Sequence, residues 1–142
     1  MKDESYPPQN ETFIFSTQKT QIMSYGPLLQ KSKQFAIRII RFYSFLQKEK
    51  GELVISKQIL RSGTSIGANA RESNNAQSAA DFINKLSIAL KEADETAYWM
   101  ELLYESNIID QQQFDSMYID LKELIALLTS SIKTCKQNNN LT

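Results

Sequence analysis

The sequence predicts an all-α fold, an antiparallel up-down-up-down four-helix bundle preceded by a flexible leader. Glycine and proline are scarce, at four and three of 142 residues, which favours long helices over strands and turns. Apolar residues recur at steps of three and four through four long segments after residue 27. Short polar breaks separate these segments, so consecutive helices should run antiparallel.

Residues 1–27 are expected to form the flexible leader. They hold all three prolines, several polar runs and one short apolar patch at residues 13–15. Such composition is typical of a terminal segment outside a packed domain, although the patch could also dock on the domain or on a partner. Residues 28–136 are long enough for one domain with a substantial core, and residues 137–142 form a polar tail.

The first predicted helix begins near Leu28 and stops before Gly51, which we expect to cap its C-terminus. The second is predicted from about Ile55 to Asn74. The expected inward residues of the first helix are Leu28, Ser32, Phe35, Ile39, Phe42 or Tyr43, and Leu46. Ala36 and Ile40 are expected to widen this inward face. Those of the second are Ile55, Ile59, Gly63, Ile66 and Ala70.

Two N-terminal capping patterns predict the starts of the third and fourth helices. Ser78 stands three residues before Asp81, and Asp110 stands three residues before Gln113. The third helix is expected to continue to about Asn107. Its apolar face comprises Ala79, Phe82, Ile83, Leu86, Leu90, Ala93, Ala97, Met100 and Leu103. The fourth helix repeats Phe114, Met117, Leu121, Leu124, Leu128 and Cys135, filled out by Tyr118, Ile125 and Ile132.

Gly63 and Gly67 lie four residues apart inside the second predicted helix. Each glycine costs about 1 kcal/mol relative to alanine in a helix interior. Since Ser62, Ala68 and Ala70 beside them are also small, we expect another helix to pack closely here. A phosphate-binding loop would instead need a preceding strand and a lysine followed by Ser or Thr, and neither is present.

The composition argues against an enzyme. Histidine is absent and Cys135 is the single cysteine, which removes the commonest general base and most ligands for zinc, iron–sulfur or haem sites. We therefore predict no catalytic residue, no metal and no cofactor, with a carboxylate magnesium site left open. A lone cysteine, no signal peptide pattern and no membrane-spanning run together predict a cytoplasmic protein.

Two glutamates on the third predicted helix need charged partners. Glu92 and Glu95 share a face with Trp99, and paired carboxylates of this kind occur in di-iron bundles. Those sites also need Glu-x-x-His pairs, which this chain cannot supply. We expect the glutamates to pair with Arg61, with Arg71 or with a neighbouring chain, because an isolated buried charge is costly. Trp99 is expected to be buried, in the core or at an interface.

The charges are balanced overall but unevenly distributed. Residues 1–77 hold eleven Lys and Arg against six Asp and Glu, whereas residues 78–142 hold five against ten. Such asymmetry indicates either an anion-binding half, or two halves that pair with each other or with a neighbouring copy.

One stripe of the first predicted helix carries a nucleic-acid hypothesis. It consists of Lys31, Gln34, Arg38, Arg41, Phe45 and Lys48, at alternating steps of three and four. No acidic residue lies between Leu28 and Lys48 to neutralise it. A stripe of this kind can bind nucleic-acid phosphates in a salt-dependent manner. The alternatives are a solvated face, or a face that meets the acidic third and fourth helices of another subunit.

Three runs of the chain resemble a known family. The first is residues 60–69 (LRSGTSIGAN), and the second is residues 76–93 (AQSAADFINKLSIALKEA). The third consists of residues 95–96 (ET) followed by residues 98–103 (YWMELL). They are similar to the four-helix bundle family of 23S rRNA intervening-sequence proteins. The resemblance covers about residues 31–136, and the first 27 residues fall outside it.

The resemblance implies an antiparallel bundle that assembles into a ring, a homopentamer, without enzymatic activity. Some family members are encoded within insertions in the large ribosomal RNA gene. A similar bundle is the accessory protein of diversity-generating retroelements, where it binds a reverse transcriptase and nucleic acid through a basic surface. The resemblance therefore implies a ribonucleoprotein role, whereas the balanced charge of this chain departs from the basic character expected of such relatives.

Overall fold

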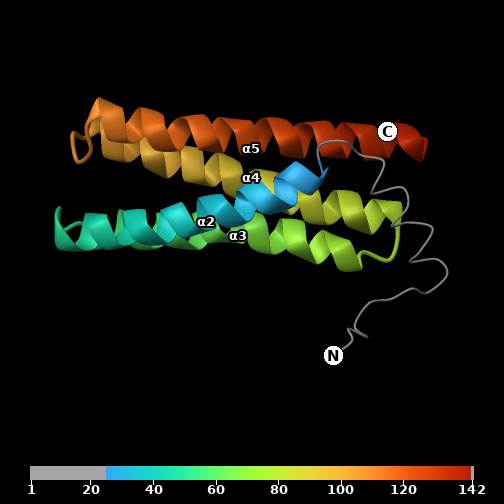
Figure 1. The fold of residues 1–142 in the computed structure, drawn as a ribbon, viewed down its shortest axis with the longest axis horizontal. Helices are drawn as coiled ribbons and strands as arrows, with labels where there is room; N and C mark the ends of the chain where they lie inside the picture. The colour runs from blue at the N-terminus through green and yellow to red at the C-terminus, as the bar shows by residue number, and fades with distance from the viewer. Residues whose placement is uncertain (1–24, 142) are drawn as a thin grey trace.

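The computed structural model describes residues 25–141, which form an antiparallel four-helix bundle (Figure 1). Its elements are α2 (Tyr25–Lys48), α3 (Ile55–Glu72), the 3₁₀ helix η1 (Ser73–Asn75), α4 (Ala79–Glu105) and α5 (Gln111–Asn138). Helices consecutive in the chain pack along extensive seams, and a smaller α2–α5 seam closes the bundle. The predicted fold class is confirmed. Residues 1–24 of the predicted leader lie outside the described residues.

Helix α2 begins at Tyr25, three residues before the predicted start. Pro27 therefore lies in the first helical turn, where a proline costs no hydrogen bond because the amides there have no intrahelical acceptor. Tyr25 is buried, and its Oη lies 2.8 Å from both Ser73 Oγ and Asn74 Oδ1. These contacts fasten the first turn of α2 to η1, which the helical spacing alone did not reveal.

The loop between α2 and α3 contains the expected glycine and an unexpected cap. Gly51 adopts a left-handed φ of +64°, as its predicted role after α2 requires. Glu52 then accepts hydrogen bonds from the backbone amides of Val54, Ile55 and Ser56 at 3.1, 3.0 and 2.6 Å. The carboxylate thus satisfies three amides at the start of α3 that have no partner within the helix.

The end of α3 differs from its prediction. The α-helix stops at Glu72, and the residues predicted to complete it form the 3₁₀ helix η1. Ser73 is fully buried there, and its hydroxyl donates to the carbonyl of Ala70 at 2.6 Å. This local bond and the contact with Tyr25 favour a tightened last turn.

Both predicted N-terminal caps are present. The Asp81 amide donates to Ser78 Oγ at 3.0 Å. Asp110 and Gln113 form a complete capping box, with each side chain bonding the other residue's backbone amide. Helix α4 ends at Glu105, two residues before the expected end, and Asn107 turns the chain with a φ of +64°.

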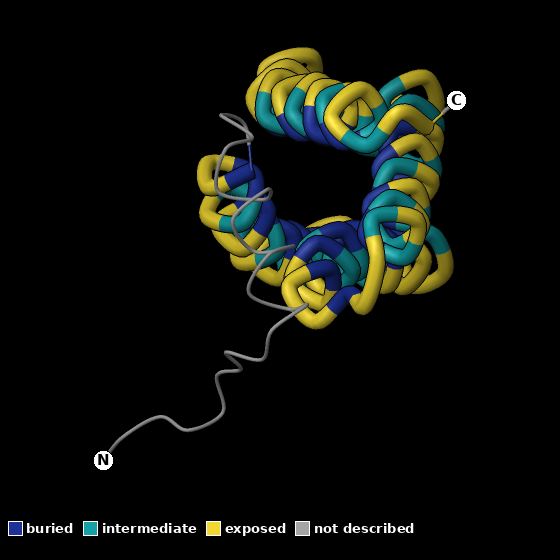
Figure 2. The backbone as a smooth tube through the Cα atoms, turned by 90° about the vertical axis from the view of Figure 1, so that its right-hand side faces the viewer, coloured by how far each residue is buried: buried dark blue, intermediate teal, exposed yellow. Residues whose placement is uncertain are grey.

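The core lies between the four helices, on their inward faces (Figure 2). Its largest fully buried side chains are Phe35, Phe82, Leu28, Ile39, Leu46, Ile59, Ile66, Leu86, Met100, Leu103, Leu121 and Leu124. The expectation that Ile40 widens the inward face of α2 is wrong, since Ile40 is 53% exposed. Ala36, Tyr43 and Ile55 are half-buried. The inward face of α2 is therefore narrower than its apolar residues suggested.

The two glycines of α3 face α2 at close range. A Cβ atom on Gly63 would lie 2.7 Å from Cγ1 of Ile39. A Cβ on Gly67 would lie 3.2 Å from the backbone carbonyl oxygen of Ser32. Larger residues would therefore separate the two helices, which accounts for glycine at both places.

Candidate nucleic-acid interface

Helix α2 is the most basic element of the bundle. It carries five cationic residues and no carboxylate: Lys31, Lys33, Arg38, Arg41 and Lys48. Helix α3 adds Lys57, Arg61 and Arg71 against a single acid, Glu72. Because α2 and α3 pack along an extensive seam, the two most basic helices of the bundle are neighbours.

Two members of the predicted stripe are neutralised within the chain. Lys31 pairs with Glu123 of α5 at 3.1 Å. Arg38 pairs with Asp120 of α5 at 2.5 Å and also donates to the carbonyl and hydroxyl oxygens of Ser116 at 3.2 and 2.8 Å. The edge of the stripe nearest α5 thus contributes partly exposed ion pairs and hydrogen bonds to the smaller α2–α5 seam.

The rest of the stripe is available to solvent. Gln34, Arg41 and Lys48 are exposed, and within residues 25–141 neither Arg41 nor Lys48 forms an ion pair. Phe45 is half-buried, stacks on Phe42 with ring centroids 6.3 Å apart, and lies below the Lys50 ammonium. The structure therefore divides the predicted stripe into a paired edge and an open edge.

Beside the open edge, a hollow of about 440 Å³ lies over the α2–α5 seam. Arg38, Arg41 and Phe45 contribute to its α2 wall, and Gln112, Gln113 and Ser116 to its α5 wall. No carboxylate lines it. Its side chains can donate hydrogen bonds to an anion from both helices.

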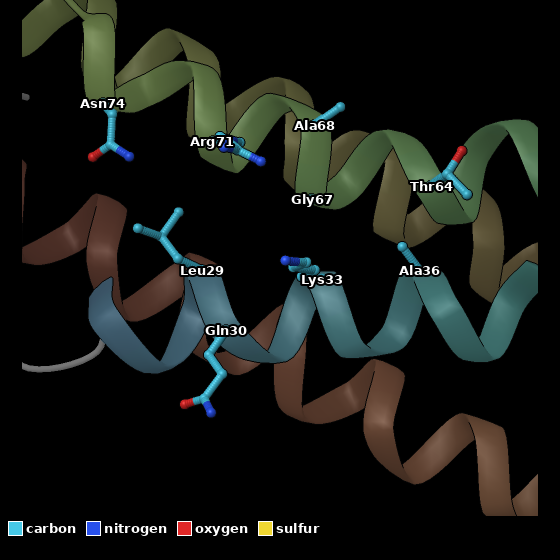
Figure 3. Close-up of a pocket in the computed structure, with 9 residues that line it drawn as sticks. All are labelled: Leu29, Gln30, Lys33, Ala36, Thr64, Gly67, Ala68, Arg71 and Asn74. Atoms are coloured by element: carbon cyan, nitrogen blue, oxygen red, sulfur yellow. The ribbon is translucent and has the colours of Figure 1, made fainter. Parts of the chain in front are cut away.

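A groove of about 450 Å³ lies on the other edge of α2, facing α3 (Figure 3). Lys33 of α2 and Arg71 of α3 both line it, and both are exposed. Lys33 lies off the predicted stripe of α2, so spacing along one helix does not select it. The sequence predicts Arg71 only as a partner for the glutamates of α4. The two cations become neighbours across a groove only once α2 and α3 are paired.

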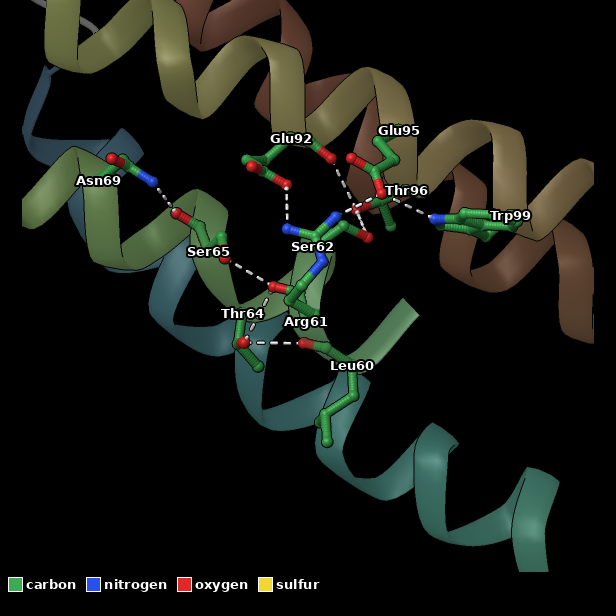
Figure 4. A network of polar contacts seen from close by, with 10 residues as sticks. All are labelled: Leu60, Arg61, Ser62, Thr64, Ser65, Asn69, Glu92, Glu95, Thr96 and Trp99. Carbon is green, nitrogen blue, oxygen red and sulfur yellow. Dashed lines mark hydrogen bonds and ion pairs between the residues drawn. The ribbon is translucent and has the colours of Figure 1, made fainter. Parts of the chain in front are cut away.

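The expected partners of Glu92 and Glu95 lie on α3. Arg61 bonds Glu92 Oε1 at 3.2 Å and also pairs with Glu95 (Figure 4). The half-buried indole of Trp99 donates to Glu95 Oε2 at 3.2 Å. The hydrogen bond from Arg61 is the main reason that the pKa of Glu95 lies below its usual value. Arg71 takes no part in this network.

The hydroxyl groups of α3 have structural partners. Thr64 donates to the carbonyl of Leu60 at 2.7 Å, and Ser65 donates to that of Arg61 at 2.6 Å. In the fully buried α3–α4 seam, Ser62 Oγ lies 2.8 Å from Thr96 Oγ1. These bonds tie short polar side chains to the backbone or to each other, as is common inside helices.

Cys135 is buried on α5, and burial raises the pKa of its thiol. Among residues 25–141 no cluster of three or more acidic or cysteine side chains is placed to hold a metal ion. None of the helices formed by these residues combines the length and hydropathy needed to cross a bilayer.

Comparison with known proteins identifies the family. Residues 27–130 match the family model described as 23S rRNA-intervening sequence protein. A crystal structure of a protein of unknown function, from the S23 ribosomal protein family of Bacteroides thetaiotaomicron, is 55% identical with a TM-score of 0.76. That match covers 78% of this chain and 98% of the other. No curated protein matches the chain. The chain belongs to the 23S rRNA-intervening sequence protein family.

Proposed function

We propose that this member of the 23S rRNA-intervening sequence protein family is a non-enzymatic, ring-forming bundle, a homopentamer, that binds RNA or DNA through the outer face of α2. The observation that carries the proposal is the charge of α2, which has five cations and no carboxylate. Arg41 and Lys48 are exposed and make no ion pair within the described residues. They are the residues of the stripe that we assign to phosphate binding.

The paired cations take a different role. Lys31 and Arg38 hold α5 through Glu123 and Asp120, so their contribution to phosphate binding is reduced. Repetition of α2 around a ring would multiply the open cations, since the potentials of neighbouring copies add. A chain with no net charge can thus present a locally basic surface.

The test compares oligomeric state with RNA affinity. The variant Arg41→Glu/Lys48→Glu reverses two open charges, and Lys91→Glu/Lys133→Glu makes the same charge change on exposed residues of α4 and α5. Fluorescence anisotropy with single-stranded RNA at about 50 mM salt should show much weaker binding for the α2 variant alone. Light scattering should show an unchanged oligomer. Equal affinity of both variants would refute the assignment to α2.

A second candidate is an interaction scaffold without nucleic-acid binding, and the opposite charges of α2 and α4 favour it. Helix α4 carries six carboxylates against two lysines. A head-to-tail contact between α2 of one copy and α4 of the next would generate a ring. The exposed apolar residues Ile37 and Ile40 on α2 and Tyr98 on α4 would become covered. Loss of the oligomer in Arg41→Glu/Lys48→Glu would select this candidate.

A further inference from the structure

The groove between α2 and α3 is a basic hollow that lies outside the stripe. Its volume of about 450 Å³ falls in the range of small-ligand sites. The lining residues are Leu29, Gln30, Lys33 and Ala36 of α2, Thr64, Gly67, Ala68 and Arg71 of α3, and Asn74 of η1. Figure 3 shows Lys33 on α2 and Arg71 on α3, on facing helices near Gly67.

The groove keeps its two positive charges. None of the residues that line it is acidic. Glu72 follows Arg71 in the chain, but its carboxylate pairs with Lys85 of α4 at 3.3 Å. Within the part of the chain that the structure describes, neither Lys33 nor Arg71 forms an ion pair. Such a groove attracts an anion.

Several of the residues that line the groove have short side chains. Ala36, Gly67 and Ala68 present at most a methyl group, and the Thr64 hydroxyl is turned back to the Leu60 carbonyl. No aromatic residue lines the groove, so it offers no surface on which a base could stack. The groove therefore suits a narrow, charged chain more than a nucleobase.

We propose that Lys33 and Arg71 grip the phosphodiester backbone of single-stranded RNA or DNA in this groove. The ligand class rests on the proposed function, because α2, which forms one wall of the groove, also carries Arg41 and Lys48. The backbone of a single strand is flexible, so its phosphates can follow the groove and reach both cations. Since the contacts are to phosphates, the groove binds without regard to base sequence.

The experiment uses the full chain and two charge-matched variants. Lys33→Gln/Arg71→Gln removes the groove cations, and Lys91→Gln/Lys133→Gln removes two exposed cations elsewhere. The probes are labelled oligouridylate and oligothymidylate of about 20 nucleotides, and a polyglutamate peptide of similar length. Thermal unfolding checks that all variants remain folded, as expected for exposed positions.

The groove variant should bind both oligonucleotides more weakly, and its salt slope should be shallower by about 1.4, the value for two lost phosphate contacts on a single strand. The control should match the parent chain. Equal binding by the groove variant and its control would overturn the proposal. Stronger binding of polyglutamate, lost in the groove variant, would also overturn it and assign the groove to an acidic protein segment.

The outcomes separate this inference from the proposed function. If Lys33→Gln/Arg71→Gln weakens binding while Arg41→Glu/Lys48→Glu does not, the groove is the binding site. The outer face of α2 is then excluded as a binding site. The reverse pattern excludes the groove and keeps the outer face. A parent chain that binds neither oligonucleotide at low salt overturns both.

Discussion

Ile39 of α2 occupies the space that Gly63 leaves in α3, so closely that a Cβ atom on residue 63 would come within 2.7 Å of Ile39 Cγ1. The stiff, β-branched Ile39 is fully buried and cannot simply rotate away. The glycine therefore costs helix propensity but allows close packing of the two basic helices.

A double-mutant cycle tests this relationship. Gly63→Ala alone should destabilise the fold by about 1 kcal/mol, because overpacking of about 1–3 kcal/mol exceeds a propensity gain of about 1 kcal/mol. In an Ile39→Ala background the same change should be stabilising, since the clash is gone. Urea unfolding measures both. A destabilising effect of equal size in both backgrounds would show that Ile39 is not the cause.

The buried hydroxyl pair between α3 and α4 makes a second prediction. Thr96→Val should cost about 1–2 kcal/mol, because it leaves the fully buried Ser62 hydroxyl without its 2.8 Å partner. Adding Ser62→Ala should recover part of this loss. Chemical denaturation of the two single variants and the double variant gives the coupling, and additive losses would contradict an interaction between the hydroxyls.

The Glu52 cap predicts a stability change in acid. Partial burial of the Glu52 carboxylate acts to raise its pKa. Hydrogen bonds from the backbone amides of Ile55, Ser56 and Val54 lower the pKa by more than burial raises it, so the pKa lies below its usual value. Because the pKa of Glu52 is lower in the folded state than in the unfolded state, the ionised carboxylate stabilises the fold at pH values above the unfolded-state pKa. This stabilisation is lost as the pH falls through the folded-state pKa. Glu52→Ala should therefore cost about 1 kcal/mol at neutral pH. The difference from the parent should shrink in acid, and a pH-independent difference would contradict the cap.

The hydrogen bond of Tyr118 predicts that the fold loses stability at alkaline pH. Its hydroxyl donates to Glu101 Oε2 at 2.7 Å, and this bond, with burial, raises the pKa of Tyr118 to about 12. A raised pKa means that the stabilisation is complete below the unfolded-state pKa near 10 and is lost as pH rises through the folded-state value. Absorbance titration of the tyrosines should show a late component from Tyr118 that moves to lower pH in Glu101→Gln, whereas the raised pKa of the buried Tyr25 should be unaffected. An unchanged titration would exclude this hydrogen bond.

Removing the acidic partners of the paired edge should strengthen RNA binding. Asp120→Asn/Glu123→Gln removes the α5 partners of Arg38 and Lys31, so both cations become available to phosphates. RNA affinity at low salt should rise several-fold, and the salt slope should steepen by up to about 1.4. The exposed pairs contribute little to stability, so the melting temperature should change only slightly. Unchanged RNA affinity would place this edge outside the interface.

The sequence predicted the elements whose determinants are local. Ser78 and Asp110 mark helix starts because a cap needs only its own turn, and Gly51 marks a helix end for the same reason. The sequence did not predict the cap formed by Glu52. The Glu52 carboxylate accepts hydrogen bonds from three successive backbone amides, and the loop has no residue of the usual N-cap types before α3. The exposure of Ile40 was missed because hydrophobicity does not show which flank of a helix is covered.

The candidate interface was predicted only in part. The stripe follows from spacing along one helix, and so was found directly. Its division into paired and open edges depends on where Asp120 and Glu123 of α5 meet α2, which is a tertiary property. The groove with Lys33 and Arg71 likewise requires α2 and α3 to be placed side by side.

The salt dependence of RNA binding by the unmodified chain tests the central claim most directly. The account predicts that the logarithm of the association constant falls linearly with that of the salt concentration, with a slope of about −2 or steeper for at least three phosphate contacts. Titrations between about 50 and 200 mM salt are sufficient to measure it. A slope near zero, or no binding at the lowest salt, would contradict the account.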